Sequence, residues 1–133
     1  MTATNETGAA TGKPLVLLRA EGVALVVFTL AAYTTTNTSW WLFPALILVP
    51  DITLLAYLAG PRLGALLYNT THTTIPPIVI GVLGIGLGLP LAKPVALIWL
   101  AHIGIDRALG YGLKYEDGFA FTHLGRVGKR AAS

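Results

Sequence analysis

The chain has 133 residues, of which 54% are hydrophobic and only 11% are charged. Soluble domains carry about 25% charged residues, and disordered chains are polar and charge-rich, so this composition argues against the first class and excludes the second. The sequence contains no cysteine, which excludes disulfides, thiolate metal sites and cysteine nucleophiles. The length allows one domain.

Residues 1–12 are small and polar, and we expect them to form a disordered N-terminal tail. Four apolar stretches follow, each long enough to cross a hydrocarbon core of about 30 Å, which takes about 20 helical residues. They run from about Pro14 to Tyr33, from Trp40 to Ala59, from Pro61 to Leu89 and from Leu91 to Tyr111. The sequence therefore predicts an all-α bundle of four transmembrane helices over residues 13–111, an integral membrane domain.

The connections between the later stretches are short. Gly60-Pro61 separates the second from the third, and Leu89-Pro90 separates the third from the fourth. Glycine ends helices and proline fits the first turn of the next one, so both connections predict antiparallel hairpins. Residues 112–133 mix basic and aromatic side chains and are expected to form an amphipathic tail on the cytoplasmic membrane surface.

The distribution of lysine and arginine predicts the orientation of the bundle. Eight of these residues fall on one side of a four-span arrangement, and only Lys93 falls on the other. The eight are Lys13, Arg19, Arg62, Arg107, Lys114, Arg126, Lys129 and Arg130. By the positive-inside rule, both termini are cytoplasmic.

Ionisable side chains within the spans are costly in a bilayer, so they are functional candidates. They are Arg19, Glu21, Asp51, His72, His102 and Asp106. At about 1.5 Å per helical residue, Asp51 and His102 lie about 13 Å, and His72 about 16 Å, from the cytoplasmic ends of their helices. Three helices thus place polar groups at a similar depth, which predicts a shared pocket open to the cytoplasm.

Prolines flank two of these positions. Pro50 precedes Asp51, and Pro76-Pro77 follows His72. Proline cannot donate a backbone hydrogen bond, so the second pair is expected to free the carbonyl groups of His72 and Thr73. Tyr68 and Asn69 fall on the His72 face and are further candidates for the pocket.

The ligand types in this pocket suit several chemistries. Asp51, His72, His102 and Asp106 offer the imidazole and carboxylate groups that Zn, Mn or Fe prefer, and His102 and Asp106 share one helix face. A divalent metal there would activate water against a lipid or isoprenoid ester. Without a metal, the same groups could act as general acid and base on a lipophilic substrate. Both readings describe a small membrane enzyme.

Other readings stay open. His72 and His102 are candidate axial ligands for a haem or a chlorophyll-type pigment in a non-catalytic subunit of a larger membrane complex. Transport of protons or cations through an Asp/His relay in an oligomer is a further interpretation. A purely structural role in a larger complex is the last one. Arg19 and Glu21 fit either the pocket or the interface. The expected partners are membrane lipids and a homo-oligomer or larger membrane complex, with no nucleic acid.

Three runs of sequence resemble a known family. They are WWLFPALILVPDITLLAYLAGPRLGALLYNTTH (40–72), LIWLAHIGIDRALGYGLKY (97–115) and FTHLGR (121–126). These motifs are similar to those of a bacterial family of small membrane proteins, the domain of unknown function 4260, over about Leu15 to Gly128. The resemblance implies a multi-pass protein of the bacterial inner membrane and marks Asp51, His72, His102 and Asp106 as motif positions.

The resemblance also draws attention to the THLG motif, in which His123 is expected to fold back to the mouth of the pocket. The arrangement of His72 before His102 and Asp106 is loosely similar to that of small membrane-bound metal-dependent hydrolases. This similarity favours hydrolysis over isomerisation.

Overall fold

A computed structural model describes residues 10–113, 121–122 and 125–126 of the chain. Helices account for 77% of this part. They are α1 (Gly12–Tyr33), the 3-10 turn η1 (Thr34–Thr36), α2 (Leu42–Leu46), the 3-10 helix η2 (Val49–Ala59), α3 (Pro61–His72), α4 (Ile75–Gly86) and α5 (Ala92–Leu109). Two short antiparallel strands follow, β1 (Phe121–Thr122) and β2 (Gly125–Arg126). The predicted all-helical class is thus confirmed, whereas the predicted tails fall largely outside the described residues.

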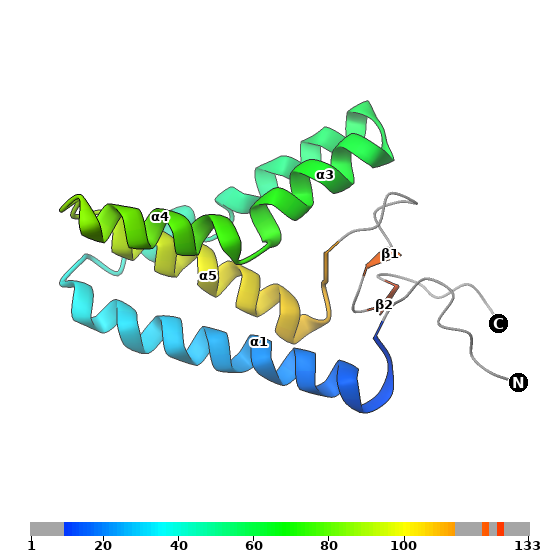
Figure 1. The fold of residues 1–133 in the computed structure, drawn as a ribbon, viewed down its shortest axis with the longest axis horizontal. Coiled ribbons are helices and arrows are strands. Elements are labelled where there is room, and N and C mark those ends of the chain that lie inside the picture. The colour runs from blue at the N-terminus through cyan, green and yellow to red at the C-terminus, as the bar shows by residue number, and fades with distance from the viewer. Residues whose placement is uncertain (1–9, 114–120, 123–124, 127–133) are drawn as a thin grey trace, which may run out of the picture.

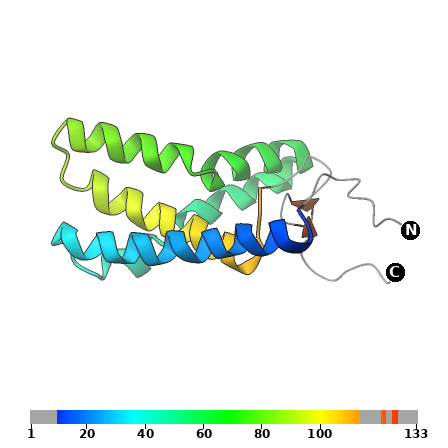
Figure 2. The ribbon, with the colours of Figure 1, turned by 60° about the horizontal axis from the view of Figure 1, so that its bottom comes forward.

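Helix α5 is the centre of the molecule. Helix α1 runs along one side of it and α4 lies along the other, as Figures 1 and 2 show. The buried side chains concentrate on α5, from Pro94 to Gly104. Helices η2 and α3 form a hairpin that diverges from α5 toward the end where α5 finishes (Figure 1). Both hairpins predicted from the short Gly60-Pro61 and Leu89-Pro90 connections are present.

Helices α1 and α5 approach closely because glycine occupies both sides of the contact. A Cβ atom on Gly22 would lie 2.6 Å from the backbone nitrogen of Ala108 and 2.8 Å from the carbonyl oxygen of Gly104. A Cβ on Gly104 would lie 2.9 Å from the carbonyl oxygen of Gly22. Small residues at such crossings let two backbones touch. This contact fixes the axial position of α5, which carries two of the predicted site residues.

The second predicted segment is a helix that changes its winding. The α-helical turn α2 gives way to the 3-10 helix η2, and the amide of Asp51 bonds to the Leu48 carbonyl at 3.0 Å, three residues back. Pro50 has no N–H to give, which favours this local tightening.

The third predicted segment is two helices rather than one. The chain is extended at Thr73 (φ −83°, ψ 151°), and α4 then begins at Ile75 with Pro76 and Pro77 in its first turn. Amide groups in the first turn have no helical partner, so the two prolines start α4 at no cost. Each half has 12 residues and is about 18 Å long, too short to cross a 30 Å hydrocarbon core alone.

Two segments of the described chain are long and apolar enough to cross a membrane, Gly12–Tyr33 and Leu42–Ala59, each with a mean hydropathy of 2.0. Within an apolar 18-residue stretch of each, only 11% and 6% of the residues are buried in the molecule. Core helices of soluble proteins are mostly buried. These two segments are far more exposed than such helices.

Candidate metal centre

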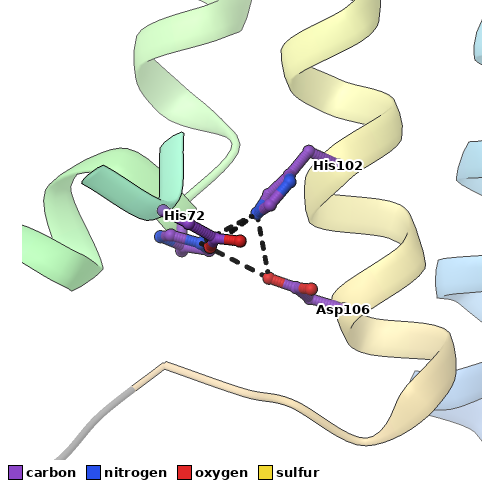
Figure 3. A group of neighbouring side chains, drawn as sticks. His72, His102 and Asp106 are labelled. Carbon is purple, nitrogen blue, oxygen red and sulfur yellow. Dashed lines mark hydrogen bonds and ion pairs between the residues drawn. The ribbon is translucent and has the colours of Figure 1, made fainter. Parts of the chain in front are cut away.

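Four predicted site residues meet at one point. One oxygen each of Asp51 and Asp106 and one nitrogen each of His72 and His102 all lie within 4.8 Å of one another. Asp51 Oδ1 is 3.1 Å from both Nε2 atoms, and Asp106 Oδ2 is 3.3 Å from His72 Nε2 and 3.2 Å from His102 Nε2. The two Nε2 atoms are 3.1 Å apart. Figure 3 shows His72, His102 and Asp106 pointing toward one another.

Each residue comes from a place where the backbone is locally constrained. Asp51 lies in the first turn of η2, and His72 is the last residue of α3, just before the break. His102 and Asp106 are one turn apart on α5 and therefore share a face. The cluster thus lies at the vertex between the η2–α3 hairpin and the long α5 helix.

A backbone carbonyl sets the orientation of the His102 ring. The Nδ1 atom lies 2.5 Å from the carbonyl oxygen of Ile47. That carbonyl is free because the amide of Asp51, which would normally bond to it, bonds to Leu48 instead. A carbonyl only accepts, so Nδ1 carries the hydrogen and donates it. The Nε2 atom then presents a lone pair to the cluster when the ring is neutral.

The His72 ring is held in the same way. Its Nδ1 atom lies 2.9 Å from the carbonyl oxygen of Tyr68 and 2.9 Å from the hydroxyl of Thr71. The ring also stacks on the Tyr68 ring, with centroids 3.7 Å apart and planes 8° from parallel. Donation from Nδ1 to the Tyr68 carbonyl directs the lone pair of Nε2 at the cluster. Such outer contacts are typical of metal-binding histidines.

Two Nε2 lone pairs and two carboxylate oxygens therefore converge. When both imidazoles are neutral, none of these four atoms carries a hydrogen to share with the others. Five of their six mutual distances are 3.1–3.3 Å. Four ligands at 2.0–2.1 Å around a tetrahedral ion lie about 3.3 Å from one another. The donor set and its spacing fit a first-row divalent ion such as Zn, Mn or Fe. Protons shared among the four groups are the alternative way to relieve the repulsion.

A second layer of contacts joins the hairpin to α5. Trp99 Nε1 donates to the Thr71 carbonyl at 2.6 Å, and Arg107 Nη2 donates to the His72 carbonyl at 3.4 Å. The carbonyl of His72 has no helical partner because α3 ends at that residue, before the prolines, and Arg107 is the residue that reaches it. The sequence analysis did not assign Trp99 or the Ile47 carbonyl to the site. A backbone carbonyl leaves no signal in the sequence, and an indole in an apolar span is typical of packing.

The site is open on one side. The His72 and His102 side chains are 3% and 5% exposed, whereas those of Asp51 and Asp106 are 34% and 18% exposed. The imidazoles thus form the buried side of the site, and the carboxylates form the side that faces outward. A small molecule or a water would reach the centre past the carboxylates.

The other candidates lie around the cluster or outside the described residues. Glu21 is exposed on α1 and interacts electrostatically with Arg107, so it is a neighbour of the site and not part of it. Arg19 donates from Nε to the Ala108 carbonyl at 2.9 Å, at the end of α5. Asn69 is half-buried, and its carbonyl accepts the amide of Thr73. His123 lies outside the described residues.

Residues 15–127 match the protein family described as Domain of unknown function (DUF4260). No curated protein and no solved structure matches the chain. The match covers most of the chain, including all four residues of the cluster, and confirms the resemblance found in the sequence motifs. The chain belongs to the DUF4260 family.

Proposed function

We propose that this protein is a small integral membrane enzyme in which Asp51, His72, His102 and Asp106 hold a divalent transition metal and act on a lipophilic substrate from the cytoplasmic side. One observation carries the proposal. Both imidazoles are anchored through Nδ1 to backbone carbonyls, so both Nε2 lone pairs meet two carboxylate oxygens within 3.1–3.3 Å. A divalent cation neutralises this arrangement.

Exposed apolar surface supports the membrane placement. Both candidate spans present most of their residues outward, and contiguous apolar surface on that scale favours contact with lipid. Trp40 and Trp41 are exposed at the start of the second span, where aromatic belts form.

The cations support the proposed orientation of the spans. Lys13 and Arg62 lie at the starts of α1 and α3, and Arg107 lies near the end of α5, all at the same end of the molecule (Figure 1). Lys93 lies at the other end. This distribution favours cytoplasmic termini.

The geometry favours a bare ion over a porphyrin or a chlorophyll-type pigment. An ion midway between two axial imidazoles, at about 2.0–2.1 Å from each, would hold the two nitrogens about 4 Å apart. The Nε2 atoms of His72 and His102 are 3.1 Å apart and share their space with both carboxylates. A planar macrocycle would have to pass between groups that are already in contact.

A bound ion would supply an activated water or polarise an ester carbonyl. The surroundings suit a substrate with an apolar part. A cavity of about 90 Å³ beside the cluster is lined by apolar side chains, including Pro50, which precedes Asp51, and Trp99, one turn before His102. The exposed carboxylates leave room for the polar end of such a substrate. Hydrolysis of a lipid ester is the reaction that this combination favours.

Metal analysis tests the centre directly. The purified full-length protein should carry about one Zn, Mn or Fe per chain and show no Soret band. His72→Ala and His102→Ala should each lower the metal content at least tenfold, because each removes one ligand. Glu21→Gln is the matched control, since it removes a neighbouring carboxylate outside the cluster, and it should leave the content unchanged. Equal metal content in all four proteins would refute the centre.

Membrane placement has a separate test. The protein should stay in the membrane fraction after an alkaline carbonate wash. Because the chain has no cysteine, two variants each introduce one labelling site. Lys13→Cys places it at the start of α1, and Ser39→Cys places it after the other end of α1, beyond η1. An impermeant maleimide applied to intact cells should label the second variant and not the first. Labelling of both or only the first would refute the proposed orientation.

Activity is tested with a panel of lipid esters, comparing the metal-loaded protein with Asp51→Asn. Hydrolysis that requires both the metal and Asp51 supports the enzyme. A fully loaded, correctly inserted protein that turns over no ester would favour the accessory-subunit reading.

A further inference from the structure

A second feature lies beside the first half of α5, whereas the Asp/His cluster lies at its second half. Helices α1 and α4 flank α5 (Figure 2), and a groove of about 480 Å³ runs between them. Apolar side chains line it almost throughout: Phe28 and Ala32 from α1, Ile78, Val82 and Ile85 from α4, and Leu97 and Leu100 from α5. The volume is in the range of sites that take small amphiphilic ligands.

One charged residue lines this groove. Lys93 lies in the first turn of α5, is half-buried, and donates from Nζ to the hydroxyl of Thr35 at 3.1 Å. No carboxylate in the described part of the chain pairs with it. The helix dipole disfavours a cation in the first turn of a helix, so the dipole of α5 gives no reason for a lysine at this position. Lys93 is also the lysine that departs from the charge pattern of the rest of the chain.

We propose that the groove binds an anionic phospholipid of the surrounding bilayer, with one acyl chain along the apolar walls and the phosphate at Lys93 and Thr35. Charge complementarity and the mixed lining carry this assignment. The apolar walls suit a hydrocarbon chain, and the amino group at one end suits a headgroup anion. The inference rests on the proposed membrane placement and is independent of the metal centre.

A second copy of the chain is a poorer occupant of the groove. The acidic residues of the described part, Glu21, Asp51 and Asp106, all lie toward the other end of the molecule. Two copies inserted in the same orientation place the same residues at the same depth in the membrane. A neighbouring copy would therefore bring its own Lys93, and no carboxylate, to the depth of this groove. An anionic lipid supplies the missing charge.

Native mass spectrometry of the detergent-purified full chain tests the headgroup site. Phosphatidylglycerol and phosphatidylcholine with identical acyl chains are the probes. The protein should bind the anionic lipid about fivefold more tightly, the effect of one lysine near a membrane surface. Lys93→Gln should abolish this preference, whereas Lys13→Gln, which removes the same charge at the other end of α1, should retain it. Equal binding of both lipids by the unaltered protein, or binding of neither, would overturn the lipid site, whereas the membrane placement stands or falls on the alkaline carbonate wash.

A pair of tryptophan substitutions on α4 tests the acyl-chain site. Val82 lines the groove, and Val79 is exposed on the same helix outside it. Val82→Trp should weaken the first bound lipid roughly tenfold, the equivalent of about two buried methylene groups, and Val79→Trp should not. The same effect from both variants would overturn the groove as the chain site. So would a dimer that Val82→Trp dissociates, because a second copy would then occupy the groove.

Discussion

The crossing of α1 and α5 at Gly22 and Gly104 predicts that the packing of these two helices controls metal binding at the proposed centre. The change is Gly22→Ala. Its Cβ would lie 2.6–2.8 Å from the backbone of Ala108, the Cβ of Arg107 and the carbonyl of Gly104, where ordinary contacts begin at 3.4 Å. Two of these three atoms are backbone and cannot rotate away. The helices would therefore have to separate by roughly 0.7 Å along this contact, since a packed interior has no slack to absorb the methyl group.

Overpacking of this kind costs about 1–3 kcal/mol. For a chain of this size, the midpoint of thermal unfolding should fall by roughly 5–10 °C, measured by circular dichroism in detergent. The same displacement moves His102 and Asp106 relative to Asp51 and His72, so metal affinity should fall by at least tenfold. The methyl group touches none of the four ligands, which makes affinity a readout of helix packing.

Gly86→Ala is the matched control, since a Cβ at Gly86 meets no atom within 4 Å. It should leave the unfolding midpoint and metal affinity unchanged or slightly raise the first, because alanine is the better helix former. If Gly22→Ala behaved like Gly86→Ala in both measurements, the close crossing and its control of the site would be refuted.

Three further results are expected. Trp99→Phe leaves the Thr71 carbonyl without its donor and should lower the unfolding free energy by about 1–3 kcal/mol, measured by chemical denaturation. Trp41→Phe, at an exposed position, should have no measurable effect. Equal effects of the two variants would contradict the role of the Trp99 indole N–H. Tyr68→Leu removes the ring stacked on His72 and should weaken metal binding roughly tenfold. Tyr68→Phe keeps the ring and should weaken metal binding less. Equal metal affinities of the two variants would rule out ring stacking as the cause. Metal affinity should fall as the pH is lowered, because protons compete with the metal for the imidazole nitrogens and metal binding releases them. An affinity that does not change with pH would count against histidine ligands.

Much of the site was predictable because depth in a helix is simple arithmetic. Asp51, His72 and His102 were placed at similar distances from one end of their helices, and the structure brings all three together with Asp106. Residue spacing and the direction of each helix suffice for that prediction. The roles of these residues as metal ligands or catalytic groups stay predictions.

The break between α3 and α4 was less accessible. Pro76 and Pro77 signal an interruption, but the apolar run continues to Leu89 and suggests one long span. The structure places the prolines in the first turn of α4, so the break falls before them at Thr73. The hydrogen bonds that orient the imidazole rings could not be predicted from the sequence, for another reason. They run to the carbonyls of Ile47 and Tyr68, and every residue has a carbonyl.

The position of the cluster at the vertex of the η2–α3 hairpin makes it a joint between two bodies. On one side is the hairpin, and on the other are α1, α4 and α5, which pack along their lengths (Figure 1). The polar contacts across the vertex gather within a few residues of His72 and His102. Because the four donors come from both sides of this vertex, a cation or protons bound there would favour one angle between the hairpin and the bundle. By linkage, a molecule that prefers one angle would change the affinity of the centre for its occupant, and the occupant would change the affinity for that molecule by the same factor.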